Sequence, residues 1–257
     1  MNAATTQAQG EQHAAPRQQM VLAQTRAELS MTLRRGESVL VTIIIPALLL
    51  LFAMSVNIQP PNGQKPIDFF VPGILVAAVM STSMVSLSIA TAYERYYGIL
   101  KRLGSSPLPR WGLLAAKTLA VLALEAAQIL FLLALAAILY GWRPQGSFLA
   151  ALFVLLLGTV TFAALGLLMA GALRAEATLA VANGLFLIFL LIGGTILPVQ
   201  RLPGFTQPLA RLLPPAAFSD ALRGALSPQG APIGSVLALT IWGIIFLVAA
   251  ALTFRWE

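Results

Sequence analysis

The sequence predicts an all-α integral membrane protein with six transmembrane helices. Of its 257 residues, 58% are apolar and only 10% are charged, whereas charged residues make up about a quarter of an ordinary soluble domain. The apolar residues form long continuous stretches. Strands of a membrane barrel would instead alternate apolar and polar side chains over about ten residues. The continuous stretches therefore indicate helices.

Six segments between charged residues each exceed the roughly 20 residues that a helix needs to cross the hydrocarbon core of a bilayer. We expect transmembrane helices at residues 39–56, 69–90, 113–140, 148–172, 177–197 and 233–254. A charge at the bilayer centre is costly, so charged residues inside transmembrane helices are rare. Glu125 is the single charged residue well inside one of these helices. Residues 38–257 are therefore interpreted as one transmembrane domain.

Basic residues are distributed unequally between the two sides of these helices. Eleven of the 16 Lys and Arg residues lie on the side of the N-terminus. Because basic residues are enriched in cytoplasmic loops, we expect a multi-pass protein of the cell membrane with both termini in the cytoplasm. The net charge of +7 follows from this distribution along the membrane edges, so the lipid bilayer is an expected partner and nucleic acid is not.

The segment before the first transmembrane helix has two parts. Residues 1–16 are polar and predict a flexible cytoplasmic tail. Residues 17–37 contain no Pro or Gly until Gly36 and predict a helix. Leu22, Leu29 and Leu33 share one face of it, and smaller apolar residues lie nearly opposite. Such a helix can lie at the cytoplasmic interface between lipid and protein, or it can be a solvated linker that only anchors the chain.

The residues needed for catalysis are absent from this sequence. His13, in the polar tail, is the sole histidine, and there is no cysteine, so neither a catalytic triad nor a zinc site can be assembled. Residues 112–118 lack the second glycine of a phosphate-binding loop. We therefore expect no catalytic residue, no metal site and no ATP hydrolysis by this chain.

Several polar residues lie within the predicted transmembrane helices. Those selected as lining a polar path are Ser81, Ser88, Glu125, Gln128 and Asn183. An ionisable side chain inside a membrane helix is a functional candidate, and Gln128 can be a hydrogen-bonding partner of Glu125 because it lies three residues further along. The same residues can also form hydrogen bonds that only hold helices together. Both interpretations stay open.

The loop at residues 94–110 is predicted to be cytoplasmic. Tyr96, Leu100 and Leu103 would share one side of a short helix that ends before Gly104 and Pro107. An apolar face of this kind suits docking into a partner protein, or contact with anionic lipid. The residues selected for docking are Glu94, Arg95, Tyr96, Gly98, Leu100 and Leu103.

The loop at residues 198–232 is predicted to be external and contains seven prolines. Its two apolar pieces, 205–213 and 216–226, are too short to cross a bilayer. We expect half-helices that dip into the outer leaflet and turn back, and that are either buried in protein or line a cavity. Asp220 and Arg223 have the i, i+3 spacing of a local ion pair.

The first loop resembles a segment shared by permeases of the ABC-2 family, in particular drug-resistance permeases of the daunorubicin type. The matching residues are Glu94, Arg95, Gly98, Leu100, Ser106, Pro107, Leu108 and Lys117. Ile99 stands where these permeases usually have Thr. The resemblance continues in the second loop, at Leu197, Pro198, Leu202, Pro203, Pro215, Asp220 and Arg223. There Pro214 replaces a usual Asn, and Phe218 occupies a position that is often Tyr.

This resemblance covers nearly the whole chain and implies the permease half of an ATP-driven exporter. Two copies of a separate ABC ATPase subunit would bind ATP and Mg, a second permease copy would complete a dimer, and this chain would bind no cofactor. The first loop would receive the conformational change of the ATPase. The second would form an external gate at Pro198, Pro203, Pro215, Phe218, Asp220 and Arg223.

The expected cargo is an amphipathic drug, natural product or lipid-like molecule. One alternative in the same fold family is a permease for lipid-linked polysaccharide or another lipid. An alternative from a different class is an ion-coupled secondary carrier that uses Glu125 and binds no ATPase.

Overall fold

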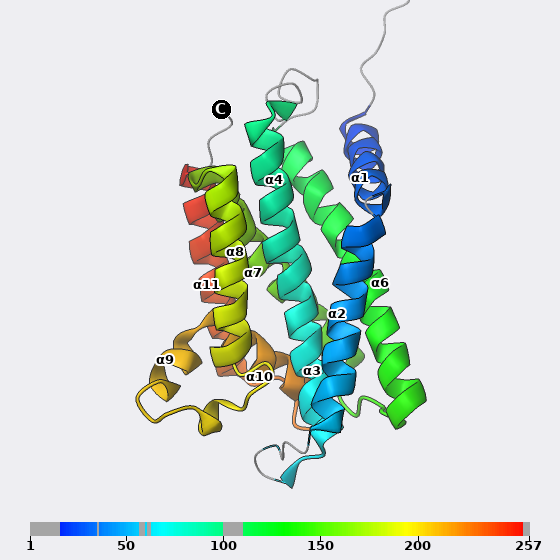
Figure 1. The fold of residues 1–257 in the computed structure, drawn as a ribbon, viewed down its shortest axis with the longest axis vertical. Coiled ribbons are helices and arrows are strands. Elements are labelled where there is room, and N and C mark those ends of the chain that lie inside the picture. Colours follow the sequence, from blue (N-terminus) through cyan, green and yellow to red (C-terminus); the bar gives the residue numbers. More distant parts are fainter. Residues whose placement is uncertain (1–15, 35, 57–59, 61–62, 100–109, 254–257) are drawn as a thin grey trace, which may run out of the picture.

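The computed structural model describes residues 16–34, 36–56, 60, 63–99 and 110–253, without the side chains of residues 36–41, 110 and 111. Every regular element in that part of the chain is a helix (Figure 1). The α-helices are α1 (Arg17–Arg34), α2 (Gly36–Ser55), α3 (Pro66–Val79), α4 (Leu87–Tyr96), α6 (Arg110–Tyr140), α7 (Phe148–Ala172), α8 (Ala175–Ile192), α9 (Gln207–Leu212), α10 (Pro214–Leu226) and α11 (Ile233–Thr253). A π-helix, η2 (Met80–Ser86), and a 3₁₀ turn, η3 (Val199–Arg201), complete the described elements.

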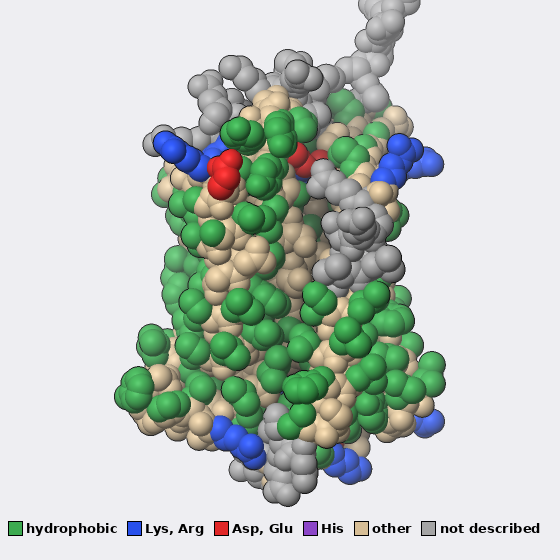
Figure 2. Space-filling view, in the orientation of Figure 1, with side chains coloured by type: hydrophobic (Ala, Val, Ile, Leu, Met, Phe, Trp, Pro, Cys, Tyr) green, Lys and Arg blue, Asp and Glu red, His purple; other side chains and the backbone are tan. Residues whose placement is uncertain are grey.

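Among the described residues, five helical stretches are long and apolar enough to cross a membrane: Pro66–Tyr96, Gly112–Tyr140, Phe148–Ala172, Ala175–Ile192 and Ile233–Thr253. The described apolar part of α2, Thr42–Ser55, is shorter, so a sixth crossing stays a prediction. Figure 2 shows a broad band of hydrophobic side chains around the middle of the molecule, with charged side chains near both ends. This band is the surface expected of a protein embedded in a bilayer.

The described residues of the two predicted loops lie at opposite ends of the molecule (Figure 1). α1, the end of α4 and the end of α11 lie at one end, and α9 and α10 lie at the other (Figure 1). α1 ends at Arg34 rather than at residue 37, because α2 already begins at Gly36. The predicted tail lies outside the described residues except for Pro16.

The second predicted crossing is longer and less regular than expected. α3, η2 and α4 form one continuous helical stretch, Pro66–Tyr96, rather than a helix at 69–90. The structure places it at the centre of the bundle, since every residue of α3 from Phe69 to Val79 is buried. A π-helical segment within an α-helix is rare and is often found at functional sites.

The fifth predicted crossing is shorter than expected, and residue 197 is the wrong end for it. α8 ends at Ile192, and Gly194 follows with a φ of +68°. A positive φ cannot continue a right-handed helix. Thr195 donates its hydroxyl to the carbonyl oxygen of Leu190 at 2.8 Å, which satisfies one of the last carbonyl groups of α8.

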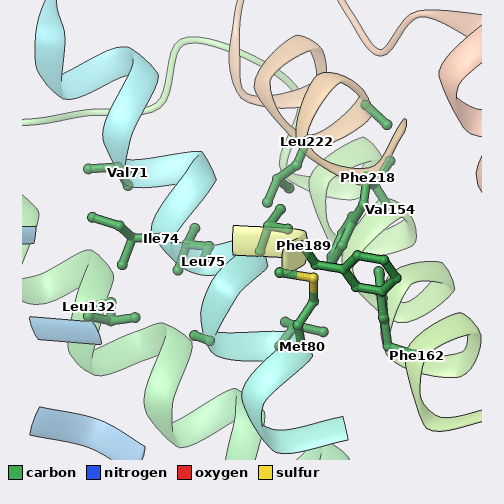
Figure 3. Close-up of a cluster of buried hydrophobic side chains, with 14 of the residues drawn as sticks. Val71, Ile74, Leu75, Met80, Leu132, Val154, Phe162, Phe189, Phe218 and Leu222 are labelled. Atoms are coloured by element: carbon green, nitrogen blue, oxygen red, sulfur yellow. The ribbon is translucent and has the colours of Figure 1, made fainter. Parts of the chain in front are cut away.

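The apolar core lies where α3, η2, α6, α7, α8 and α10 meet (Figure 3). Phe162 of α7 packs against Phe218 of α10 and Phe189 of α8, with ring centroids 5.9 and 6.2 Å apart. Gly158 faces the Phe218 ring so closely that a Cβ atom there would overlap it. The short helix α10 is therefore held inside the bundle by α7.

Candidate functional site

A buried cluster of three charged side chains joins α1, α4 and α6. We call it the Lys117 cluster. Lys117 Nζ lies 3.0 Å from Glu28 Oε1 on α1 and 2.5 Å from Glu94 Oε2 on α4. The Lys117 side chain is only 3% exposed. Buried charges are tolerated when they are paired, so this lysine holds two carboxylates, and with them two helices, against α6.

Local sequence places each member of the cluster. Glu28 is the single acidic residue of α1, and Gln24, one turn earlier, donates its amide to Glu28 Oε1 at 3.0 Å. Lys117 lies about two turns into α6, and Glu94 lies in the last turn of α4. Glu94 and Lys117 therefore flank the predicted docking loop on both sides, and Glu28 connects that loop to the N-terminal helix.

Arg95 points away from the cluster and caps another helix. Its guanidinium donates to the carbonyl oxygen of Gly171 at 2.5 Å and to that of Leu173. These carbonyl groups lie at the C-terminal end of α7, where a cation is favourable. The sequence selected Arg95 as a docking residue, and the structure places its side chain against α7.

The end of α4 exposes two aromatic rings. Tyr96 and Tyr97 are each 64% exposed, with ring centroids 5.2 Å apart. Gly98 follows with a φ of +70° and donates its N–H to the carbonyl oxygen of Arg95, which ends the helix. The prediction of one uninterrupted short helix from Glu94 onwards is therefore wrong, because a left-handed residue breaks it. Its other members, Leu100 and Leu103, lie outside the described residues.

The residues predicted to line a polar path bind separate partners and do not contact one another in a single row. Gln128 accepts a hydrogen bond from Thr82 of η2 at 3.1 Å and donates to the carbonyl oxygen of Thr42 at 2.6 Å. Ser88 of α4 donates its hydroxyl to the carbonyl oxygen of Val85 in η2, earlier in the same continuous helical stretch. In a similar way, Asn183 lies on an exposed face of α8 and bonds to Leu179. Ser81 is half-buried.

Glu125 bonds to a different residue from the one expected. Thr159 of α7 donates its hydroxyl to Glu125 Oε2 at 2.5 Å, and Glu125 is 2% exposed. Gln128, the partner expected from its spacing, bonds to η2 and α2 instead. Glu125 therefore joins α6 to α7 in the bundle interior.

A second polar cluster lies at the opposite end of the molecule, around Arg223. Its guanidinium donates to the carbonyl oxygens of Gly194 at 2.5 Å, Thr195 at 3.2 Å and Phe69 at 3.4 Å. It also lies 4.0 Å from the centre of the Phe69 ring. The ion pair expected from the i, i+3 spacing is present, with Arg223 Nη1 3.6 Å from Asp220 Oδ1. Burial lowers the pKa of Arg223 to about 10, so the side chain stays charged at neutral pH.

Three of the six predicted gate residues, Pro198, Asp220 and Arg223, line one cavity at this cluster. Phe218 of α10 is fully buried against Phe162 of α7, and Pro215 is buried against Gly193. Pro198 is also buried, whereas Pro203 lies on an exposed turn before α9. A cavity of about 790 Å³ adjoins the cluster and is lined by Asp68, Trp142, Arg211, Asp220 and Arg223, among others.

Sequence reasoning missed the residues that complete both clusters. Glu28 carried a usable signal, since it is the one acidic side chain in an otherwise basic helix. Thr159, which belongs to neither cluster but bonds to Glu125, carried no signal that distinguishes it from the other hydroxyl residues of the helices. The carbonyl groups that Arg223 binds belong to the backbone, so side-chain patterns could not identify them.

Comparison with known proteins identifies the family of this chain. The family model of the ABC-2 type transporters matches residues 19–227. The "Putative transport permease YvfS" of Bacillus subtilis (strain 168) is 24% identical over 233 residues, which cover 88% of this chain and 93% of that protein. The "Probable multidrug ABC transporter permease YbhS" of Escherichia coli (strain K12) is 24% identical over 190 residues, 72% of this chain and 48% of that protein. This chain therefore spans about half the length of the Escherichia coli relative.

The matched residues include α1, the Lys117 cluster, the docking loop and the Arg223 cluster. The match to the family model, residues 19–227, covers well over half of the 257 residues of the chain. The chain therefore belongs to the ABC-2 type transporter family and is one of its membrane permeases.

Proposed function

We propose that this chain is the permease subunit of an ATP-driven exporter. In this proposal α2 forms the sixth crossing and both termini lie in the cytoplasm, because eleven of the 16 basic residues lie on that side. Two permease copies form a dimer and two ABC ATPase subunits bind beneath it. The ATPases bind and hydrolyse ATP with Mg.

The Lys117 cluster is the observation that carries the proposal. It joins the two helices that flank the docking loop, and it also joins them to α1. A force applied to the loop by a partner would therefore reach three helices at once. The exposed Tyr96 and Tyr97 rings at the same end offer the aromatic contacts that are enriched in protein interfaces. The position of the loop supports an ATPase as that partner.

The external end supports a gate. α10 is too short to cross the bilayer, and its Pro214 and Pro215 start the helix inside the bundle. Arg223 ties α10 to the end of α8 and the start of α3. A gate made of buried half-helices would open by a movement between two packed states. The cargo is an amphipathic molecule, a proposal supported by the multidrug name of the Escherichia coli relative.

The test is purification of the tagged chain from its native host in mild detergent. We expect a P-loop ATPase to co-purify in equal amount and to hydrolyse ATP. Tyr96→Asp together with Tyr97→Asp should remove the ATPase and leave membrane insertion intact, since an acidic pair would disrupt an aromatic contact. Phe205→Asp, at an exposed aromatic of the opposite end, is the matched control and should retain the ATPase. A stable chain without any ATPase would contradict the proposal.

A further inference from the structure

The helix α2 contains a proline in its interior. Pro46 lies near the middle of α2, which runs from Gly36 to Ser55. A proline has no backbone N–H, so it cannot donate to the carbonyl oxygen four residues earlier, and its ring crowds that carbonyl group. In α2 this carbonyl group belongs to Thr42. The bilayer core offers no water to replace the missing donor, so a membrane helix takes a replacement from elsewhere in the protein.

A side chain of another helix supplies a donor at this point. Gln128 of α6 donates its Nε2 to the carbonyl oxygen of Thr42 at 2.6 Å, and Gln128 is only 2% exposed. Its amide oxygen accepts the hydroxyl of Thr82 of η2 at 3.1 Å. A side-chain amide has both a donor and an acceptor, whereas a carboxylate can only accept. Gln128 therefore binds α2 through one atom and η2 through the other.

Both segments that Gln128 binds depart from a regular α-helix. Sharp bends in helices occur most often at proline, and π-helical segments are often found at functional sites. α2 runs beside α3 and α6 (Figure 1), which brings its proline close to η2, where α3 ends. Residues 42–46 of α2, which we call the Pro46 hinge, are thus connected to η2 by a single side chain.

The two sides of the Pro46 hinge are packed differently. After the proline, Leu50 and Ala53 are 1% and 4% exposed and belong to the apolar core. Before it, Ile44 and Ile45 are exposed, and Ile43 is half-buried. The part of α2 after Pro46 is therefore anchored in the bundle, and bending at the hinge would move the part before it.

The part of α2 before Pro46 also forms a wall of a second cavity, of about 340 Å³. Thr42 and Ile43 line this cavity together with Thr82 and Gln128. Lys117 lines it as well, so the cavity extends to the Lys117 cluster. A change in the angle of α2 at the hinge would move one wall of the cavity away from η2 and α6.

We propose that Gln128 takes the place of the N–H that Pro46 lacks and thereby holds the Pro46 hinge closed over this cavity. When the bond from Gln128 to Thr42 opens, the part of α2 before Pro46 moves away from η2 and exposes the cavity. Gln128 is then a positioning residue that acts through α2. The use of this movement in transport rests on the proposed function, whereas the hydrogen-bonding role does not.

A double-mutant cycle on the purified full-length chain tests the hydrogen-bonding role. Gln128→Met keeps a long unbranched side chain, and it should lower the melting temperature by at least about 2 °C, because a buried acceptor loses a donor. Thr82 can then donate to the backbone of its own helix. Pro46→Ala restores an N–H that can donate to Thr42. In that background Gln128→Met should lower the melting temperature by about half as much or less, as for two residues that share one partner.

A second interior proline provides the control for this cycle. Pro72 lies inside α3, about 15 Å along the helical stretch from Thr82 at 1.5 Å per residue. Pro72→Ala should leave the effect of Gln128→Met unchanged, because distant substitutions are additive. If Gln128→Met alone fails to fold, as judged by size-exclusion elution, recovery of a folded chain by Pro46→Ala supports the role. Continued failure of the double variant would overturn it.

Thiol labelling tests the movement of the hinge. The sequence contains no cysteine, so an introduced thiol reports on one position. Ile43→Cys places a thiol in the cavity wall before Pro46, and Leu49→Cys places one at a half-buried position after it. We expect Gln128→Met to speed the labelling of Ile43→Cys by N-ethylmaleimide several-fold and to leave that of Leu49→Cys unchanged. Adding Pro46→Ala should return the Ile43→Cys rate to its original value.

The outcomes also separate this role from the proposed function. An equal effect of Gln128→Met with and without Pro46→Ala would overturn the role of Gln128, even if an ATPase co-purifies. Faster labelling at both thiols would indicate general loosening of α2 and would overturn the hinge, as would no change at either. Selective labelling of Ile43→Cys in a chain that binds no ATPase would support the hinge and contradict the exporter.

Discussion

At the scale of single residues, Arg223 holds three segments of the chain together. It lies on α10 and binds carbonyl oxygens just after α8 and at the start of α3. Gly73 leaves room for this approach, because a Cβ atom there would overlap the carbonyl oxygen of Thr195. A planar guanidinium can serve several acceptors at once. The residue therefore has a structural role in positioning α10.

Replacing Arg223 should destabilise the protein. Arg223→Met leaves the carbonyl oxygens of Gly194 and Thr195 without their donor, and hydrogen bonds to charged groups contribute about 1.5–3 kcal/mol each. We expect the free energy of unfolding in detergent to fall by about 2–4 kcal/mol, which thermal melting followed by circular dichroism would detect. Arg211→Met, at an exposed arginine of the same cavity, is the control. Equal melting of the two variants would contradict the assignment.

Glu125 is the residue that distinguishes an ATP-driven permease from an ion-coupled carrier. Glu125 accepts a hydrogen bond from the Thr159 hydroxyl, and the side-chain amide oxygen of a glutamine at this position can accept the same bond. Glu125→Gln should therefore preserve ATP-driven efflux of an amphipathic dye, within about two-fold of the wild type, as for a hydrogen bond that is retained. If the variant assembles normally and efflux is lost, proton coupling through this carboxyl group becomes the better explanation.

At the scale of elements, the sequence predicted helices well where local signals agree. α7 begins and ends at the predicted residues, because Ser147 caps its start by accepting the N–H of Ala150 and Arg174 follows its end. The π-helix η2 was not predicted, since it depends on packing rather than on residue type. The continuity of the second crossing up to Tyr96 was missed because Glu94 was taken as its boundary and the helix predicted from Glu94 was assigned to the loop. Both acquire partners only in the folded structure.

For the Lys117 and Arg223 clusters too, the sequence predicted some members and missed others. Glu94, Lys117, Asp220 and Arg223 lie in recognisable motifs, so the sequence could select them. Their partners come from other elements, such as Glu28 on α1 and the backbone after α8. Contacts between distant segments have no periodicity or spacing along one sequence, which explains why only one side of each cluster was predicted.

The contact between α7 and α10 makes a prediction about small residues. Gly158→Ala would place a methyl group against the buried Phe218 ring, which Phe162 also confines. Overpacking of this kind costs about 1–3 kcal/mol. Gly184→Ala in α8 is the control, because nothing lies within 4 Å of its added Cβ, and alanine favours a helix by about 1 kcal/mol. We expect lower thermal stability for the first variant and equal or higher stability for the second.

At the scale of the whole molecule, one continuous helical stretch connects the two clusters. Pro66–Tyr96 binds Arg223 near its start, through the carbonyl oxygen of Phe69, and binds Lys117 near its end, through Glu94. Most of its length is buried in the bundle. η2 interrupts the stretch between the two clusters, at a point where the pitch of the helix already departs from the α-helical form. Movement at one end can therefore reach the other through a single element.

This connection predicts that Lys117 links ATP hydrolysis to transport. Lys117→Met removes the cation that Glu28 and Glu94 share, and removing one partner of a buried pair is strongly destabilising, by about 3–5 kcal/mol. α1 and α4 should then separate from α6, whereas Tyr96 and Tyr97 remain available to the ATPase. We expect the complex to assemble and hydrolyse ATP, with dye efflux reduced at least about ten-fold.

Two variants decide whether the lost efflux comes from the cluster itself. Lys117→Arg keeps a cation between Glu28 and Glu94 and should retain most of the efflux, because a guanidinium also pairs with two carboxylates. Lys65→Met removes an exposed lysine at the opposite end and should have no effect. Efflux and hydrolysis that fall together in Lys117→Met would indicate simple misfolding. Efflux that stays at the wild-type level would show that the three helices move without the cluster, and the coupling would then have to pass through other contacts of α4.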